Sequence, residues 1–326
     1  MDSVGAFWFY HHYVDVRKDV IMVMDRKYIL TVFTPAYNRA HTIGRTYESL
    51  CRQTCNNFEW LVIDDGSSDN TRQLVEGWIA ENKIPIRYIY QENQGMHGAH
   101  NTAYKNIDTE LNTCIDSDDW MPDDAVEKII SFWKKFGSDR VAGIIGLDAT
   151  ADGQILGDRF PDSLKEITLR GFHEDLKGSG DKKLVYRTDV IRNTPEYPLF
   201  EGERYVGLIY KYHMVDEKYP LLVSNDVYVI VDYQDDGSSR GMWRQYWNNP
   251  KGFAFLRKYD MIQTHLWKRK IEDNIHYVSH SIRSRNWHFL QESPLKWYTL
   301  VSFVPGFLLY LFNRHQVKRG NLYKKV

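Results

Sequence analysis

Short apolar runs alternate with polar loops and helical patterns through the first half of the chain. Four of these runs indicate buried strands, because each is short, rich in β-branched or aromatic residues and followed by a polar loop. They are Tyr28–Phe33, Phe58–Ile63, Ile86–Tyr90 and Glu110–Ile115. Helical spacing follows the first two, with Thr42 and then Ser68 or Asp69 as expected N-caps. The alternation predicts an α/β fold with a mainly parallel sheet and helices on both faces.

Polar side chains cluster in the loops that follow the four predicted strands. In parallel α/β sheets ligands bind at this edge, so we expect the loops to form one rim. The side chains expected there are Tyr37, Asn38, Arg39, Asp65, His100, Asn101, Asp116 and Asp118. Aromatic, amide, acidic and basic groups together suit a nucleotide. The sequence has neither the G-x-G-x-x-G fingerprint nor a P-loop, which argues against a dinucleotide cofactor and a P-loop enzyme.

The densest charge follows the fourth predicted strand, where Asp116, Asp118 and Asp119 fall within four residues. Carboxylates this close repel one another unless a cation or hydrogen-bond donors lie among them, and a hard divalent metal is the simplest answer. If strand geometry continues through Asp118, Asp116 and Asp118 point to one side and Asp119 to the other. A helix is expected to open at Pro122, and an acidic turn capping that helix is the alternative reading.

The composition limits the classes of function. With 326 residues and 43% apolar content, the chain can bury a full core. Its net charge of −1 gives no general attraction for nucleic acid, and we expect no nucleic-acid partner. Three cysteines are too few and odd in number for a disulfide framework, which favours a reducing, cytoplasmic compartment. Cys51 and Cys55 are expected in the core.

Three segments are expected along the chain. Residues 1–27 lack the basic and apolar regions of a secretory signal and are expected to form an N-terminal extension. Residues 28–240 form the domain that carries the polar rim. Residues 241–326 are expected to form a C-terminal helical region, for which association with a membrane is one of two readings.

The C-terminal region contains an uncharged run, Trp297–Phe312, interrupted by Pro305 and Gly306. A spanning helix needs ~20 apolar residues, so this run is too short to cross a bilayer. Aromatic rings with basic flanks favour instead a peripheral contact of residues 294–326 with the anionic inner face of the cell membrane. A helical hairpin packed on the domain, or across a homodimer, is the alternative.

The serial motifs resemble those of inverting family 2 glycosyltransferases with the GT-A fold, over residues 28 to about 235. The motifs are Thr34–Asn38, Asp64–Ser67, Asn93–Gly95 with Ala99–Asn101, and Asp116–Asp119. The resemblance implies a nucleotide-sugar donor, a UDP-sugar, with Mn²⁺ or Mg²⁺ on its diphosphate. The implied nucleotide contacts are Pro35, Tyr37, Asn38, Arg39, Asp65, Gly95, His100, Asn101, Asp116 and Asp118. Asp118 and Asp116 would hold the metal.

The resemblance also implies a general base, because an acceptor hydroxyl is too weak an acid to attack without help worth ~10²–10⁴ in rate. The family usually has an Asp where this chain has Arg204. That departure leaves Glu203 as the expected catalytic base and Glu201 as its substitute, while a charge at a helix N-terminus is the alternative role of Glu203. A second departure places Met96 and His100 where many relatives have basic residues.

By this analogy the expected function is metal-dependent, inverting transfer of a hexose or N-acetylhexosamine to a glycan or lipid-linked acceptor in surface-polysaccharide synthesis. A non-catalytic nucleotide-sugar-binding or membrane-scaffold protein is the alternative, favoured by Arg204 at the usual base position. The turn at Asp235–Arg240 is expected to close over the donor. Lys177–Lys183 is expected to be a mobile loop that either meets the diphosphate or is a solvated linker.

Overall fold

The computed structural model of the chain describes residues 27–232 and 242–318. Three predicted features lie outside the described residues, wholly or in part. They are the N-terminal extension up to residue 26, the turn at Asp235–Arg240, and the basic end of the chain from Arg319.

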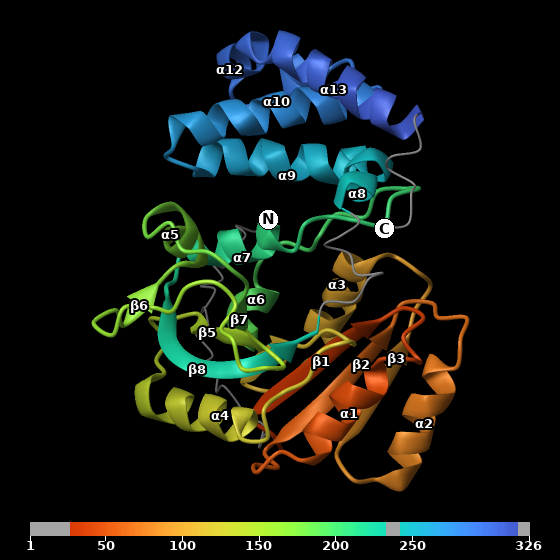
Figure 1. The fold of residues 1–326 in the computed structure, drawn as a ribbon, viewed down its shortest axis with the longest axis vertical. Coiled ribbons are helices and arrows are strands. Elements are labelled where there is room, and N and C mark those ends of the chain that lie inside the picture. Colours follow the sequence, from red (N-terminus) through yellow and green to blue (C-terminus); the bar gives the residue numbers. More distant parts are fainter. Residues whose placement is uncertain (1–26, 233–241, 319–326) are drawn as a thin grey trace, which may run out of the picture.

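The described residues form a sheet of eight strands with the order β3-β2-β1-β4-β7-β5-β8-β6 (Figure 1). The strands are β1 (Leu30–Ala36), β2 (Phe58–Asp64), β3 (Ile86–Tyr90), β4 (Leu111–Cys114), β5 (Gly143–Thr150), β6 (Glu166–Ile167), β7 (Lys182–Arg187) and β8 (Leu221–Val231). Pairing is parallel from β3 to β4 and between β5 and β8. β7 is antiparallel to β4 and β5, and β6 is antiparallel to β8. The prediction of a mainly parallel sheet is confirmed.

The helices fall into two groups along the chain. The first group lies on the sheet and comprises α1 (Ile43–Cys51), α2 (Thr71–Glu81), α3 (Met96–Asn106), α4 (Ala125–Phe136), α5 (Leu169–Glu174), α6 (Thr188–Arg192) and α7 (Ile209–Asp216). The second group is the C-terminal layer, which comprises α8 (Met242–Asn248), α9 (Pro250–Gln263), α10 (Trp267–Arg283), α11 (Phe289–Glu292), α12 (Lys296–Val301) and α13 (Phe303–Lys318).

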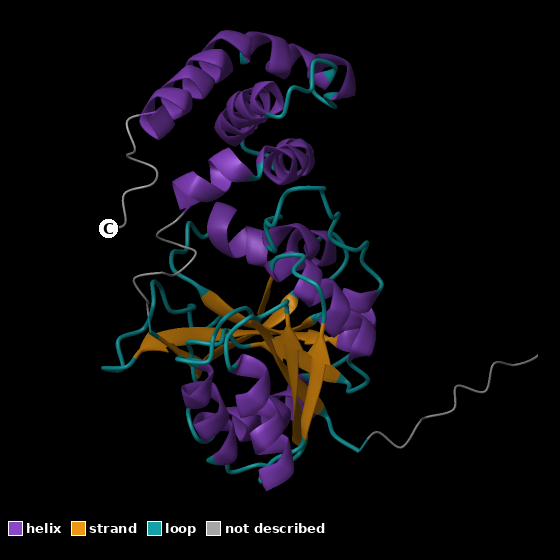
Figure 2. Cartoon of the chain, turned by 90° about the vertical axis from the view of Figure 1, so that its right-hand side faces the viewer, coloured by secondary structure: helices purple, strands orange, loops and turns teal. Residues whose placement is uncertain are grey.

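The sheet separates two apolar cores, so helices cover both of its faces (Figure 2). All seven residues of β2 are buried, because alternate side chains of the strand point to opposite faces of the sheet and helices cover both faces. Trp60 packs into the core beneath α1, α2 and α4, whereas Leu61 packs into the core beneath α3, α6 and α7. Cys51 and Cys55 pack against the first core, as expected.

The C-terminal layer stacks beyond the sheet domain, with α9 nearest, then α10, and α12 and α13 outermost (Figures 1 and 2). Its small core contains Met261, Tyr277, Val278, Ile282 and Phe289. The predicted C-terminal helical region is therefore confirmed as helical over its described part. Within residues 27–232 and 242–318, every helix is too short or too polar to cross a membrane.

Candidate functional site

A cleft of about 900 Å³ opens along the edge of the sheet where β1, β2, β4 and β5 end. β1 pairs in parallel with both β2 and β4, so the loops that follow these three strands reach the same edge of the sheet. The predicted residues that line the cleft are Pro35, Tyr37, Arg39, Asp65, Gly95, Asp116 and Asp118. Residues far apart in the sequence are thus brought to one rim.

Asn38 holds the first two loops together and does not itself line the cleft. Its backbone N–H donates to Ser67 Oγ at 2.8 Å, and its side-chain Oδ1 accepts from the backbone N–H of Ser68 at 2.8 Å. The residue has φ of 55°, a left-handed conformation that Asn tolerates better than most residues. Asn38 therefore positions Tyr37, which is half-exposed at the cleft.

Asp65 shapes the loop between β3 and α3. Its buried carboxylate accepts hydrogen bonds from Gln91 Nε2 at 2.7 Å and from the backbone N–H groups of Gln94 and Gly95, both at 2.8 Å. Burial raises the pKa of Asp65, while these hydrogen bonds act in the opposite direction. Gly95 has φ of +84°, and a Cβ there would lie 2.1 Å from the backbone oxygen of Arg204. Only glycine lets the segment around Arg204 approach this loop.

His100 and Asn101 are not brought to the cleft, contrary to the prediction. Met96 and Ala99 are three residues apart on α3, so they share the helix face that lines the cleft. His100 and Asn101 follow on the next part of the turn and point into the protein. His100 is fully buried, and burial lowers its pKa to about 3. The Asn101 side chain exchanges two hydrogen bonds of 2.9 Å with the backbone of Tyr197. Both residues support the site from behind.

The three carboxylates of the acidic loop form one cluster, with one oxygen of each within 4.8 Å of the others. Strand geometry does not continue through Asp118, the condition under which Asp119 would point away from Asp116 and Asp118, because β4 ends at Cys114 and the chain then turns. In this turn the backbone N–H of Asp119 donates to Asp116 O at 3.1 Å. A triad of carboxylates replaces the expected pair.

The charge crowding in this triad is visible in the pKa of Asp119. Burial, together with the charges of Asp116 and Asp118, raises that pKa to about 8, although the charge of Lys183 opposes the shift. One oxygen of Asp119 accepts from the backbone N–H of Asp232 at 3.2 Å. Hard oxygen ligands crowded in this way fit Mg²⁺ or Mn²⁺, which would relieve the repulsion.

The loop leads to α4 three residues later than predicted. Pro122 lies in the preceding turn, where its carbonyl accepts from the backbone N–H of Ala125 at 3.0 Å, and α4 begins at Ala125. Asp124 occupies the N-cap position without a side-chain capping bond. The acidic triad is therefore separate from the helix cap, and the alternative reading of a mere capping turn does not account for it.

Glu203 lies beside the cleft and its carboxylate faces α9. Its two oxygens accept from the backbone N–H groups of Lys251 and Gly252, each at 2.9 Å, at the first turn of that helix. The residue is buried and does not line the cleft, and exposed Glu201 does not line it either. A carboxylate at a helix N-terminus interacts favourably with the helix dipole. The geometry thus gives Glu203 a structural role, and its role as base stays a prediction.

Several cleft residues were not predicted from the sequence. They are Met96, Asp148, Arg204 as a lining residue, Tyr205, Tyr212 and Gln245. The apolar run from Val141 to Leu147 is a strand signal of the same kind as the four that were used, and it would have pointed to Asp148 at its end. Lys182 and Lys183 begin β7 and do not belong to the preceding loop.

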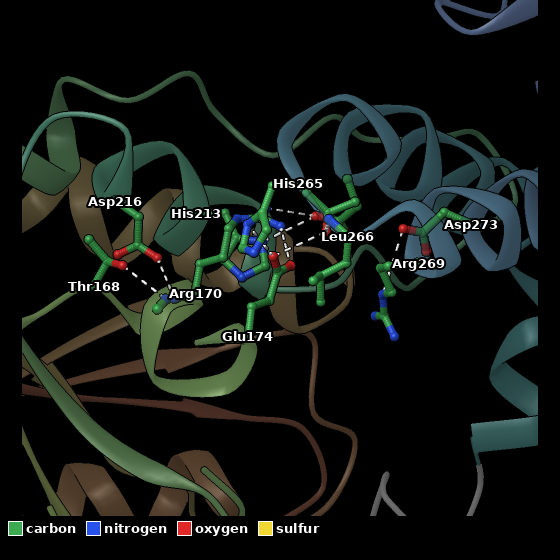
Figure 3. Close-up of polar contacts among 12 residues, drawn as sticks. Thr168, Arg170, Glu174, His213, Asp216, His265, Leu266, Arg269 and Asp273 are labelled. Atoms are coloured by element: carbon green, nitrogen blue, oxygen red, sulfur yellow. Dashed lines mark hydrogen bonds and ion pairs between the residues drawn. The ribbon is translucent and has the colours of Figure 1, made fainter. Parts of the chain in front are cut away.

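Helix α5 supplies one wall of the cleft through Leu169 and His173. The backbone N–H groups of Leu169 and Arg170 donate to the Asp216 carboxylate of α7 at 3.1 and 2.8 Å (Figure 3). Thr168 caps the same helix by accepting from the backbone N–H of Gly171. The backbone N–H groups at the start of α5, which have no partner within the helix, therefore bond to the side chains of Asp216 and Thr168.

The Arg170 side chain ties α5 to the C-terminal layer. Its guanidinium donates to Glu174 at 3.0 Å and to Asp260 of α9 at 3.2 Å, and it contacts His213 Nδ1 at 2.7 Å (Figure 3). Burial alone would raise the pKa of Asp260, but His213 and Arg170 lower it. Glu174 also accepts from Thr264 Oγ1 at 3.0 Å. A wall of the cleft is thus fastened to α9.

Comparison with known sequences places the motif residues in a family. Residues 31–191 match the family described as Glycosyl transferase family 2. The chain is 27% identical over 235 residues to Glycosyltransferase GlyA of Streptococcus pneumoniae, covering 69% of this chain and 33% of that protein. It is 36% identical over 108 residues to the Escherichia coli UDP-Glc:alpha-D-GlcNAc-diphosphoundecaprenol beta-1,3-glucosyltransferase WfgD, covering 33% of this chain and 42% of that protein. The matched part spans less than half the length of either relative.

Comparison with solved structures shows the same fold. S. aureus TarS 1-349 in complex with UDP-GlcNAc has a TM-score of 0.58 at 18% identity, covering 90% of this chain and 92% of that one. The mannosyltransferase PcManGT from Pyrobaculum calidifontis, in complex with GDP-Man and Mn²⁺, has a TM-score of 0.51 at 14% identity, covering 87% of each chain.

Proposed function

Residues 31–191 belong to glycosyl transferase family 2 and the chain has the GT-A fold, and from this premise we propose that the protein transfers a sugar from a UDP-sugar to an acceptor hydroxyl. The acidic triad, whose three residues line the cleft, carries the proposal. It lies where the family motif implies the diphosphate, with the other motif loops along the same rim.

The donor site proposed here has three parts along the rim. Tyr37 presents a half-exposed ring to the base, and Asp65 holds the adjoining loop. Asp116 and Asp118 would hold Mn²⁺ or Mg²⁺, which when bound neutralises charge on the leaving diphosphate. Exposed Arg204 lines the cleft and supplies a cation for the phosphates, in place of the basic residues that the loop before α3 lacks.

The proposed reaction is a single displacement with inversion, in which the acceptor hydroxyl attacks the sugar carbon and the UDP leaves. The hydroxyl proton must pass to a base, and a carboxylate suits this task. Glu203 remains the predicted base. To act as one, its carboxylate would have to give up its hydrogen bonds with the backbone N–H groups of α9 and accept the proton of the acceptor hydroxyl instead. Glu201 is the nearby substitute in the sequence.

The test is release of UDP from UDP-glucose, UDP-galactose and UDP-N-acetylglucosamine by the full chain, with Mn²⁺ and with chelator. We expect metal-dependent release from one of these donors, which Asp118→Asn should abolish. The alternative, a non-catalytic binding protein, predicts that a UDP-sugar binds but that no UDP is released from it, either in water alone or with an acceptor present.

We also propose that the protein contacts the inner face of the cell membrane through an apolar surface on α12 and α13. We name this surface the outer face, and it consists of Trp297, Leu300, Val301, Val304, Leu308 and Phe312. The side chains of Trp297, Val301 and Val304 are 79%, 74% and 64% exposed. Large exposed apolar patches are rare on monomeric soluble proteins and mark sites that contact a protein or a membrane.

Charge favours an anionic membrane over a second protein copy as the partner. Residues 294–326 contain six lysines and arginines and no acidic residue, in a chain whose net charge is −1. Basic residues beside exposed aromatic rings bind the headgroups of anionic lipids at about 1 kcal/mol each. The name of WfgD gives that relative a diphosphoundecaprenol-linked acceptor, and a lipid-linked acceptor of this kind would be available to the present protein at the membrane.

Sedimentation with vesicles tests this contact. We expect the full chain to bind phosphatidylglycerol–phosphatidylcholine vesicles, to bind phosphatidylcholine vesicles weakly, and to lose part of its binding at high salt. Analytical ultracentrifugation run alongside would reveal the rival partner. A stable homodimer that binds no vesicles would overturn the membrane proposal.

A further inference from the structure

Two charged residues lie in the cleft on the far side of the acidic triad from the implied nucleotide loops. The implied nucleotide loops follow β1, β2 and β3, and the acidic triad follows β4. The next two strands in the sheet are β7 and β5, which carry Lys183 and Asp148. Both residues line the cleft.

Asp148 is built into the cleft wall without a full set of partners. Its side chain is 3% exposed, and its Oδ1 atom is buried with no hydrogen-bond partner among the described residues. Such an atom loses its hydration and gains nothing in return, so a protein retains it only where a ligand or water completes it. Burial is the main reason that the pKa of Asp148 rises to about 6, and the nearby charge of Lys183 opposes the rise.

Lys183 faces the same space from the neighbouring strand. In the antiparallel register Lys183 is opposite Gly146, so its side chain is on the same face as Asp148, diagonally across the strand pair. Its Nζ donates to the backbone oxygen of Cys114 at 3.2 Å. None of the ion pairs among residues 27–232 and 242–318 joins Lys183 to Asp148. The Lys183 Nζ and the Asp148 carboxylate are therefore not in direct contact, although their backbone positions are diagonal neighbours about 7–8 Å apart.

We propose that Asp148 and Lys183 form the subsite that binds the hydroxyl groups of the donor sugar, and this inference rests on the proposed function. A carboxylate only accepts hydrogen bonds and an ammonium only donates them, whereas a hydroxyl does both. A sugar hydroxyl between them donates to Asp148 Oδ1 and accepts from Lys183 Nζ. The order along the sheet, with base, diphosphate and then this pair, matches the order of the parts of a UDP-sugar.

The position of these residues makes them specificity-determining. A buried polar group that is left unpaired penalises a sugar whose hydroxyl points elsewhere, so such sites discriminate between epimers. Hydrogen bonds to charged groups are strong enough for one lost contact to weaken binding by about 10- to 100-fold. Asp148 and Lys183 therefore set which UDP-sugar binds, and the loss of Asp148 should not affect the binding of UDP itself.

The experiment is calorimetric titration, with Mn²⁺ present, of UDP and of UDP-glucose, UDP-galactose and UDP-N-acetylglucosamine. Asp148→Asn should weaken the tightest UDP-sugar of the wild type about 10-fold or more and leave the affinity for UDP within about twofold. Lys183→Met should weaken that UDP-sugar about 10-fold more than it weakens UDP, because the charge of Lys183 also acts on Asp119. The control is Asp152→Asn, an exposed carboxylate outside the cleft, which should change neither affinity. Asp148→Asn should melt at the same temperature as the wild type or higher, because it removes a buried, unpaired charge.

Three outcomes would overturn the subsite. An equal loss of UDP and UDP-sugar affinity would place the pair at the nucleotide, and unchanged UDP-sugar affinity would remove it from the donor site. A much lower melting temperature for Asp148→Asn would show that the carboxylate supports the fold. Failure of the proposed function looks different, since a wild type that binds neither UDP nor any UDP-sugar would refute the donor site as a whole.

Discussion

The sheet domain and the outermost helices of the C-terminal layer bury opposite kinds of residue. In β2 the whole strand is buried, and its apolar side chains fill both cores. In α12, α13 and the junction between them, the buried residues are small or polar, namely Thr299, Ser302 and Gly306, while the large apolar side chains of the outer face are exposed. This difference is what the proposed membrane contact of the outer face requires, because large apolar side chains are placed there on the surface and not in a core.

Close approach between helices explains the inward residues of the C-terminal layer. A Cβ at Gly306 would lie 2.6 Å from Cβ of Val278 in α10, so only glycine permits this packing. Thr299 donates to Asn274 of α10 at 2.5 Å, which satisfies a buried polar pair. Small residues and interhelical hydrogen bonds are the means by which helices associate in apolar surroundings, where large side chains can face outward.

The largest effect should come from placing the same charge in each region. Val62→Asp in β2 buries an unpaired carboxylate, which costs more than about 4 kcal/mol and should prevent folding. Val304→Asp on the outer face should shift the melting temperature by less than about 3 °C and weaken binding to phosphatidylglycerol vesicles about 10-fold. Circular dichroism melts and vesicle sedimentation measure both. If the two substitutions destabilise equally, the contrast between the regions is false.

The next largest effect concerns the cleft, where charge serves a ligand. Asp118→Asn should weaken Mn²⁺-dependent binding of UDP about 100-fold or more, because one charged ligand of the proposed metal site is lost. The fold should be unaffected, since Asp118 lies at the rim of the sheet. Calorimetric titration of UDP with and without Mn²⁺ measures the effect. Asp123→Asn, an exposed neighbour outside the triad, is the control, and metal dependence that persists in Asp118→Asn would refute the assignment.

A smaller effect is expected at the joint between the two regions, where Glu203 accepts from the first turn of α9. Glu203→Gln keeps one acceptor but loses the charge at the helix N-terminus, so the free energy of unfolding should fall by about 1–2 kcal/mol. Urea denaturation measures this. Exposed Glu201→Gln should leave stability unchanged. A fall in turnover of ~10² or more at unchanged stability would instead favour the role of base for Glu203.

The smallest effect is a pH dependence in the C-terminal layer. Burial, aided by the charges of Arg257 and Arg269, lowers the pKa of His276 to about 4. The unfolded chain binds a proton near pH 6.5 and the folded chain does not, so this contribution to stability is complete above that pH and is lost as pH falls toward 4. His276→Gln should reduce the loss of stability between pH 7.5 and 5.5 by about 1 kcal/mol in urea denaturation. Exposed His315→Gln should leave that loss unchanged.

Local patterns in the sequence were sufficient for the framework of the fold. Apolar runs predicted β1 to β4, and the position of polar loops after them predicted the rim that Tyr37, Asp65 and Asp118 share. The same rule applied to the run before Asp148 would have added β5. β7 escaped this reasoning, because its antiparallel pairing with β4 and β5 depends on partners far away in the chain.

The sequence by itself determined which segments form strands and helices and which loops carry charge, because those depend on periodicity over a few neighbouring residues. Only the tertiary structure decided which side chains meet. The orientation of α3 directs His100 away from the cleft. The first turn of α9, some fifty residues after Glu203, donates hydrogen bonds to the Glu203 carboxylate and holds it away from the cleft. The pairing of β5 with β7 placed Lys183 beside Asp148. Such contacts depend on helix orientation and strand register, which are set by packing between segments distant in the sequence.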